Sequence, residues 1–334
     1  MRIVLCYPVE SRHFEKISQS MPGADVVDAG QERVAQELLA ADIFCGHAKV
    51  PVDWDRVVEQ GRLKWIQSSA AGMDHCLVPA VIESDIVVTS ASGVLADQVA
   101  EHAIALMTAW TRGLPVFFRA QQQKEFIRRP TRDLTRATVG IVGLGGVGRR
   151  LAQLLAAFQC RVLAVDLFPV DKPSYVDSLA PADRLDEMLP LLDFLVLCAP
   201  LNVQTRNMLD AQRMAKMNPG ALLVNVARGA LVVHDDLVAA LRNRQLAGAV
   251  MDVTEPEPLP VDSPLWAMPN VIVTPHVGGQ AAWRSDLTTD LFCRNLVRWQ
   301  RNQPLINQLS DKRLGFPVRG RVPLWDEITG SEGT

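Results

Sequence analysis

Charged and histidine side chains follow three strand-like apolar runs in the second half of the chain. The run "LLVNVARG" carries Arg228, "VMDVTEPEP" carries Asp252 and then Glu257, and "VIVTPHVGG" carries His276. A guanidinium can hold a carboxylate, an imidazole can donate a proton to a carbonyl oxygen, and an acid beside the imidazole favours its protonated form. At the carboxyl ends of parallel strands, such groups would suit hydride transfer to a 2-keto acid. Glu255, in the same "EPEP" run, is an alternative acid.

A glycine-rich turn separates an apolar run from an amphipathic one in "TVGIVGLGGVGRRLAQLLAAFQCRVLAVD". The pattern GxGxxG in this setting permits a tight turn and close approach of the backbone to a pyrophosphate, and the alternative is a plain strand-to-helix turn. Asp166 ends the next strand, where a carboxylate can accept both ribose hydroxyls of NAD, and "DLFPVD" offers no arginine for the phosphate of NADP. We therefore predict NAD as the cofactor, with contacts from Gly143, Gly145, Gly146, Val147, Gly148 and Asp166.

Two series of alternating strands and helices must position these groups. The first contains "RIVLCYP", "DIFCGH", "LKWIQSS" and "DIVVTS"; the second begins at Thr138 with nearly continuous apolar strands, as expected for parallel sheets covered on both faces. Long helical runs flank the second series. The sequence predicts an α/β protein with two Rossmann-like or flavodoxin-like domains, the nucleotide domain (107–284) being inserted into a substrate domain (1–106 and 285–334). The part after Pro304 has no clear periodicity.

The composition is that of an ordinary globular protein, with 334 residues, 48% hydrophobic and 21% charged residues and a formal net charge of −3. This charge gives no reason to expect nucleic acid or an anionic membrane as a partner. The six cysteines lie far apart without CxxC pairs, which indicates reduced thiols in the cytoplasm and no metal site. No apolar stretch reaches the ~18 residues needed to cross a bilayer, and the N-terminus reads as a strand.

From about residue 40 to 300 the sequence resembles the D-isomer-specific 2-hydroxyacid dehydrogenase family. The motifs "GLGGVG", "APLNVQTRNML", "NVARG", "DVTEPEP" and "TPHVGG" occur in the family's order. The resemblance implies that Arg228 clamps the substrate carboxylate, that His276 is the general acid in reduction and the base in oxidation, and that Glu257 bonds the other imidazole nitrogen.

The same resemblance assigns binding roles in both domains. Asp252 would orient the nicotinamide carboxamide, and Pro200 and Thr205 of "APLNVQT" would touch the cofactor. In the first domain "SSAAGMDH" resembles the family's glycine loop, where the N–H groups of Ala71 and Gly72 would meet the substrate carboxylate. We expect the histidines at 75 and 102 to be structural.

The substrate implied is a small 2-keto acid or its 2-hydroxy acid. Phosphoglycerate dehydrogenases have additional arginines that hold the substrate phosphate, at positions that correspond here to Cys45 and Ser68. Lys49 could contact a substrate anion, but one lysine provides little positive charge for a phosphate. Unphosphorylated glyoxylate or hydroxypyruvate is therefore expected, with 3-phosphoglycerate dehydrogenase as the alternative activity. Formate dehydrogenase is a poorer match, because that enzyme resembles a version with glutamine in place of Glu257.

Two further expectations rest on relatives. The C-terminal-binding-protein corepressors resemble this family and keep its arginine, glutamate and histidine, so an NADH-sensing binding protein is an alternative of another class. By analogy with relatives that pair through the nucleotide domain, we expect a homodimer that uses the long helix from Glu101 to Thr111. Leu106 and Met107 are apolar there, although burial in the core would explain them equally well.

Overall fold

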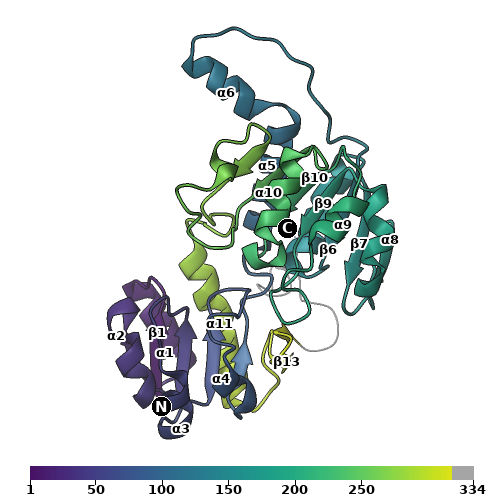
Figure 1. Ribbon diagram of the computed structural model, residues 1–334. Helices are drawn as coiled ribbons and strands as arrows, with labels where there is room; N and C mark the ends of the chain where they lie inside the picture. The colour runs from purple at the N-terminus through teal and green to yellow at the C-terminus, as the bar shows by residue number, and fades with distance from the viewer. Residues whose placement is uncertain (318–334) are drawn as a thin grey trace. The chain divides into compact units, whose positions relative to one another are not determined.

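The computed structural model describes residues 1–317, which form two compact units (Figure 1). Unit 1 comprises Met1–Leu95 together with residues 281–317, and unit 2 comprises Ala96–Gln280. The units divide earlier in the chain than the boundaries expected after residues 106 and 284. The first expected boundary falls inside α5 (Ala96–Thr111), and this helix packs as one piece along α7 (Gly146–Ala157) of unit 2. Residues 318–334 of the expected substrate domain lie outside the described residues.

Unit 1 is built on a parallel sheet with the strand order β2-β1-β3-β4-β5. Its strands are β1 (Arg2–Cys6), β2 (Asp25–Asp28), β3 (Ile43–Gly46), β4 (Trp65–Ser68) and β5 (Val87–Thr89). Its helices are α1 (Ser11–Ser20), α2 (Gly30–Glu37), α3 (Trp54–Gln60), α4 (Pro79–Glu83) and α11 (Arg284–Gln300), with a 3-10 turn at Leu38–Ala40.

Alternate residues of these strands fill two separate cores. One face of the sheet contributes Val4, Phe44 and Ile66 to a core with α2, α3 and α4. The other face contributes Ile3 and Trp65 to a core covered by α1 and α11. The period-2 alternation of apolar side chains therefore places helices on both faces of the sheet.

The last helix belongs to unit 1 through polar as well as apolar contacts. The Asn295 side chain donates to Gln67 Oε1 at 2.9 Å, and the Tyr7 and Thr289 hydroxyls lie 2.9 Å apart in the same interior. A short antiparallel pair, β13 (Leu309–Asp311) and β14 (Phe316–Pro317), follows in the segment where the sequence shows no periodicity. The expected return of the chain to its first domain is confirmed.

Unit 2 is built on a parallel sheet with the strand order β12-β11-β10-β9-β6-β7-β8. Its strands are β6 (Thr138–Val142), β7 (Arg161–Asp166), β8 (Ser178–Pro181), β9 (Phe194–Leu197), β10 (Leu222–Asn225), β11 (Gly248–Met251) and β12 (Val271–Val273). Besides α5 and α7, its helices are α6 (Leu114–Gln122), α8 (Leu185–Met188), α9 (Ala211–Lys216) and α10 (His234–Arg242). It has 3-10 turns at Ala182–Arg184, Leu189–Leu191, Gly229–Leu231 and Pro264–Trp266.

The order of the strands creates a switch point in this sheet. From β6 the chain builds outward through β7 and β8, and then returns to add β9 to β12 on the other side of β6. Open parallel sheets bind ligands outside the carboxyl ends of the strands at such a point, which here lies between β6 and β9. The two-unit α/β architecture with an inserted, doubly wound second unit is the fold class predicted from the sequence.

The long helical run before the second sheet is interrupted where glycine and proline predict. Gly113 adopts a left-handed conformation, with φ 69°, between α5 and α6, and Pro115 lies in the first turn of α6. Within residues 1–317 no helix combines the length and apolar character needed to span a membrane.

Candidate active site

The glycine turn predicted to bind a dinucleotide connects β6 to α7. Gly143 has φ 93°, and a Cβ on Gly148 would lie 2.1 Å from the Gly143 carbonyl oxygen, so both positions need glycine for the fold itself. Gly145 differs, because a Cβ there would meet no atom within 4 Å. The open space at Gly145, beside the free N–H groups that begin α7, is where a pyrophosphate can approach the backbone. The turn therefore fits a dinucleotide.

Asp166 ends β7 beside this turn, as predicted. Its carboxylate accepts hydrogen bonds from the backbone N–H of Leu144 at 2.7 Å and from that of Phe168 at 2.9 Å. These bonds fix the carboxylate at the carboxyl edge of the sheet and leave acceptor capacity for a ligand hydroxyl. The structure thus brings the glycine turn and Asp166 together.

Arg149 secures the loop that follows Asp166. Arg149 lies in the first turn of α7, and its side chain is buried. It donates to the carbonyl oxygens of Leu144 at 3.1 Å and Asp171 at 2.8 Å, and it pairs with the Asp171 carboxylate at 3.1 Å. Arg150 pairs with Asp97 of α5 at 2.6 Å. Neither partner could be identified from spacing along the chain, because each lies on another element.

Arg228 follows β10 in a loop held by a buried amide. The Asn225 side chain accepts from the Ala227 N–H at 3.1 Å and donates to the Arg228 carbonyl oxygen at 2.8 Å. The next residue, Gly229, lies against the loop after β11, since a Cβ on it would be 2.0 Å from the carbonyl group of Thr254. This contact brings the Arg228 loop against the loop that carries Glu257.

Asp252, which follows β11, is the hydrogen-bonding centre of this edge. Its side chain is 3% exposed and accepts from the Thr274 hydroxyl at 2.6 Å, from the Val277 N–H at 3.0 Å and from the Gly278 N–H at 2.9 Å. His102 of α5 lies 3.2 Å from the same carboxylate. Asp252 thus fixes the turn that contains His276.

His276 and Glu257 form a direct pair. The His276 Nδ1 lies 2.7 Å from Glu257 Oε1, and the two side chains are 43% and 44% exposed. His276 adopts a left-handed backbone conformation, with φ 55°, which side chains other than glycine rarely take. Its N–H donates to the Asp252 carbonyl oxygen at 2.8 Å and holds it there. The acid beside the imidazole is therefore Glu257, as predicted, rather than Glu255.

Pro200 and Thr205 lie in the turn after β9, at the same edge. The Thr205 hydroxyl donates to the Pro200 carbonyl oxygen at 2.6 Å and accepts from the Asn202 N–H at 2.9 Å, so this hydroxyl closes the turn. Burial raises the pKa of the neighbouring Cys198 thiol to about 12, which makes it unsuited to act as a thiolate nucleophile.

The residues predicted in the first domain follow strands β3 and β4 of unit 1. The Lys49 N–H donates to Gln31 Oε1 at 2.7 Å, and the Lys49 side chain is exposed. Ala71 and Gly72 follow a turn in which the Ser68 hydroxyl accepts from the Ala70 N–H at 3.0 Å. The sequence did not predict the stacking of the His47 and His75 rings, whose centroids are 3.9 Å apart.

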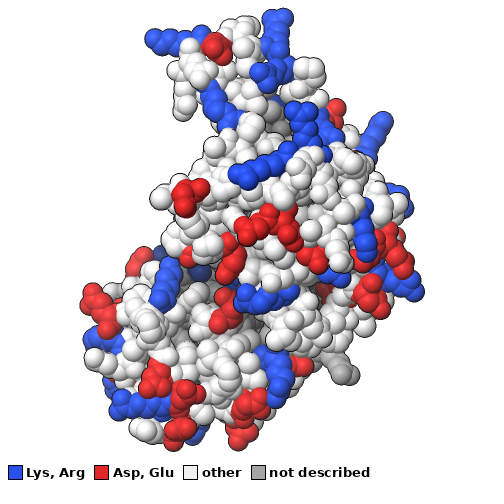
Figure 2. Space-filling model, in the orientation of Figure 1, with Lys and Arg blue, Asp and Glu red and all other residues white. Residues whose placement is uncertain are grey.

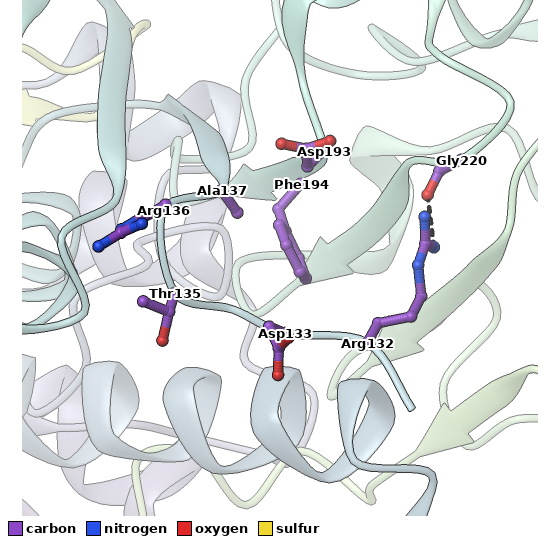
Figure 3. A pocket seen from close by; sticks show the side chains of 8 residues that line it. All are labelled: Arg132, Asp133, Thr135, Arg136, Ala137, Asp193, Phe194 and Gly220. Atoms are coloured by element: carbon purple, nitrogen blue, oxygen red, sulfur yellow. Dashed lines mark hydrogen bonds between the residues drawn. The ribbon is translucent and has the colours of Figure 1, made fainter. Parts of the chain in front are cut away.

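The opposite edge of the second sheet also contains a cavity. It has a volume of about 240 Å³ and lies where β6, β9 and β10 begin, beside Ala137, Phe194 and Gly220 (Figure 3). Arg132 lines it and donates to the Gly220 carbonyl oxygen at 2.8 Å. Since the predicted site residues follow the carboxyl ends of the strands, this cavity is not the candidate active site. Among residues 1–317 no three histidine, cysteine or acidic side chains are grouped so as to hold a metal ion.

Fold and site together define a class of protein: a two-unit α/β protein with a dinucleotide-binding turn and a histidine–carboxylate pair at one sheet edge. Residues 104–278 match the sequence profile described as "D-isomer specific 2-hydroxyacid dehydrogenase, NAD binding domain". The chain therefore belongs to the D-isomer-specific 2-hydroxyacid dehydrogenase family, which confirms the resemblance of its motifs.

Two curated relatives and one solved structure show the range of this likeness. The chain is 33% identical to a glyoxylate reductase of Thermofilum pendens over 70% of this chain and 71% of that protein. It is 35% identical to an (S)-sulfolactate dehydrogenase of Chromohalobacter salexigens over 68% and 74% of the two chains. A D-isomer-specific 2-hydroxyacid dehydrogenase from Xanthobacter autotrophicus, solved with NADPH and MES, superimposes with a TM-score of 0.80. That structure is 29% identical and covers 94% of this chain and 99% of its own.

Proposed function

We propose that this protein is an NAD-dependent oxidoreductase that interconverts a small 2-keto acid and its D-2-hydroxy acid. The observation that carries the proposal is the 2.7 Å pair of His276 and Glu257, at the same sheet edge as the glycine turn and Arg228. Membership of the 2-hydroxyacid dehydrogenase family supports the reaction class.

In reduction, Arg228 would bind the substrate carboxylate and polarise the keto oxygen, and His276 would donate the proton that this oxygen takes up. Glu257 would hold the ring in place through Nδ1. Ala71 and Gly72 would donate backbone N–H groups to the carboxylate, and Lys49 would lie near the substrate as a further cation. In oxidation, His276 would accept the hydroxyl proton.

The dinucleotide would be held by the glycine turn, by Asp166 at its ribose and by Asp252 at its carboxamide. When bound, the nicotinamide supplies the hydride in reduction and accepts it in oxidation. Within residues 1–317, Asp252 Oδ2 accepts one hydrogen bond, from the Gly278 N–H, so it keeps acceptor capacity for the amide. Pro200 and Thr205 would border the same ligand.

Preference for NAD over NADP is supported by the charges around Asp166. The Asp166 carboxylate would repel a ribose phosphate, and Arg149 is engaged with Asp171. The Lys172 ammonium donates to the Val176 carbonyl oxygen at 2.7 Å. We expect kcat/KM with NADH to exceed that with NADPH by at least about tenfold, and Asp166→Ser to narrow the ratio. Equal use of both cofactors by the wild type would overturn this part of the proposal. The relative solved with NADPH is a precedent for NADPH binding in this fold.

An unphosphorylated substrate is supported by the two positions where phosphoglycerate dehydrogenases carry arginine. Cys45 is fully buried in the core, and Ser68 is buried with its hydroxyl bonded to the Ala70 N–H. Neither position supplies a cation for a phosphate. Glyoxylate and hydroxypyruvate are therefore the first substrates to test, and the name of the Thermofilum relative agrees with that choice. A large preference for 3-phosphohydroxypyruvate over hydroxypyruvate would favour the 3-phosphoglycerate dehydrogenase alternative instead.

A homodimer is supported by exposed apolar side chains in and after α6, namely Leu114, Phe118 and Phe126. Leu106 and Met107, on the helix expected to pair, are buried in the core of unit 2 instead. Lysine and arginine side chains predominate around the α6 region, with few acidic side chains among them, whereas both signs of charge are mixed elsewhere on the visible face (Figure 2). Sedimentation as a monomer at micromolar concentration would refute the dimer, and Phe118→Ser is expected to weaken it.

The decisive experiment is a panel of small 2-keto acids with NADH and NADPH, followed at 340 nm on the wild type and on His276→Ala. We expect steady NADH consumption with at least one acid and a loss of about 10²- to 10⁴-fold in kcat in the variant. A wild type that binds NADH and turns over no 2-keto acid would favour the NADH-sensing binding protein.

A further inference from the structure

His102 lies on α5, a few residues after the chain enters unit 2. Its Nε2 is 3.2 Å from Asp252 Oδ1 and 3.1 Å from the Thr274 hydroxyl oxygen, and its side chain is 20% exposed. It contacts the carboxyl edge of the second sheet, where Asp252 and His276 lie, and α5 contributes no other residue to the predicted site. The mechanism proposed above does not use it.

The hydrogen bonds around Thr274 determine the proton on His102. The Thr274 hydroxyl gives its single proton to Asp252 Oδ1, at 2.6 Å, because a carboxylate can only accept. A lone pair of the hydroxyl oxygen and a carboxylate oxygen therefore both face His102 Nε2. Two acceptors against one ring nitrogen require that nitrogen to carry the hydrogen. His102 is thus a donor to Asp252 and Thr274.

Asp252 transmits this contact to His276. Its carboxylate accepts the N–H groups of Val277 and Gly278, the two residues after His276. There is little free space in this arrangement, since a Cβ on Gly278 would lie 2.9 Å from Asp252 Oδ2 and 3.2 Å from the His102 ring. A shift of the carboxylate would therefore move the backbone that holds His276 at φ 55°.

We propose that His102 is a positioning residue: its Nε2–H holds Asp252 and Thr274, and through them it fixes the turn that presents His276. The catalytic part of this inference rests on the function proposed above. This hydrogen-bonded group of His102, Asp252 and Thr274, called the clamp below, lies within unit 2 and joins α5 to the turn that contains Gly278. Displacing a reacting group by about 1 Å can cost about 100-fold in rate, so losing the clamp should affect kcat.

The test compares His102→Leu, which removes the donor, with His102→Gln, whose Nε2 can replace the ring N–H. His234→Leu, at the start of α10, is the matched control for losing a histidine in the same unit. For His102→Leu we expect kcat to fall about 10- to 100-fold, with the Kd for NADH changed less than threefold. We expect His102→Gln to recover most of kcat, and His234→Leu to match the wild type.

Amide hydrogen exchange gives a readout independent of activity. We expect the Val277 and Gly278 amides to exchange at least about tenfold faster in His102→Leu than in the wild type, in the absence of any ligand. Thr274→Val should act in the same direction, and the two substitutions should be less than additive because they disrupt one network. The His102→Gln amides should exchange as in the wild type.

The outcomes separate this inference from the proposed function. An active wild type whose kcat and amide exchange are unchanged by His102→Leu overturns the positioning role. His102→Gln as impaired as His102→Leu overturns the donor role. A wild type inactive on every 2-keto acid, with fast exchange in His102→Leu and Thr274→Val but not in His102→Gln, overturns the proposed function and supports the clamp.

Discussion

Replacing Glu257 with glutamine tests the acid–base pair directly. Glutamine keeps an oxygen that can accept from His276 Nδ1, 2.7 Å away, and removes the negative charge. Two unit charges about 4 Å apart attract by about 1 kcal/mol in water and by about 4 kcal/mol in a partly dehydrated site. The two side chains are 43% and 44% exposed, so solvent screens the pair and the expected value is about 1 kcal/mol.

The sign follows from what the carboxylate does for the ring. Glu257 holds His276 through Nδ1, and an amide holds the ring less firmly, so the group that donates the proton in reduction and accepts it in oxidation is less well placed. Since about 1.4 kcal/mol corresponds to a tenfold change in rate, a loss of about 1 kcal/mol should lower kcat/KM about fivefold in both directions.

The assay is kcat/KM for reduction and for oxidation, with Glu255→Gln as the matched control from the same "EPEP" run. The acid that lies beside His276 is Glu257, so replacing Glu255 should leave both values unchanged. Identical values for the wild type and Glu257→Gln would refute the reasoning. A loss with Glu255→Gln alone would transfer the role to Glu255.

Three further predictions concern binding, stability and thiol reactivity. Gly145→Ala should fold normally and weaken NADH binding by at least about tenfold, as measured by fluorescence titration. Gly148→Ala should instead lower the melting temperature in thermal unfolding, because its Cβ would lie 2.1 Å from a backbone oxygen. Lys312 donates to the carbonyl oxygens of Val81, Ser84 and Ile86 around the end of α4. Lys312→Ala should therefore lower the free energy of unfolding, measured by chemical denaturation, by about 1–3 kcal/mol. Arg313→Ala removes an exposed ion pair and should lower it by less than about 1 kcal/mol. Burial raises the pKa of Cys160, one of the less buried cysteines, to about 11. The native protein at pH 7.5 should therefore react slowly with a thiol reagent, whereas all six thiols should react after denaturation. A fast reaction of the native protein would contradict this prediction.

The strands predicted from the sequence are those with buried apolar side chains, including the edge strands β5 and β12. The two strands of the parallel sheets that were missed, β2 and β8, are also edge strands, but all their side chains are half-buried or exposed. A strand with a buried face stands out as an apolar run, whereas an exposed edge strand has no such signal. The expected boundary after residue 106 cut through α5 for a related reason, because a helix pattern does not say which sheet the helix covers.

The candidate site was predictable to the extent that strand ends reveal it. Arg228, Asp252 and His276 directly follow apolar runs, and a parallel sheet gathers such positions at one edge. The supporting residues were not predictable in the same way. Asn225 lies within a run of buried residues, and His102 is an ordinary polar residue of a helix far from Asp252 in sequence. Their roles depend on partners brought together only by folding.

The path of the chain through unit 1 determines the order in which it can be assembled during synthesis. The face of its sheet that carries Ile3 and Trp65 is covered in part by Phe292 and Leu296 of α11, which are translated after all of unit 2. A nascent polypeptide therefore presents a complete second sheet to its surroundings while the first still lacks its final helix. On the ribosome, the dinucleotide-binding half can reach its native packing first, and the N-terminal half must wait for the end of α11.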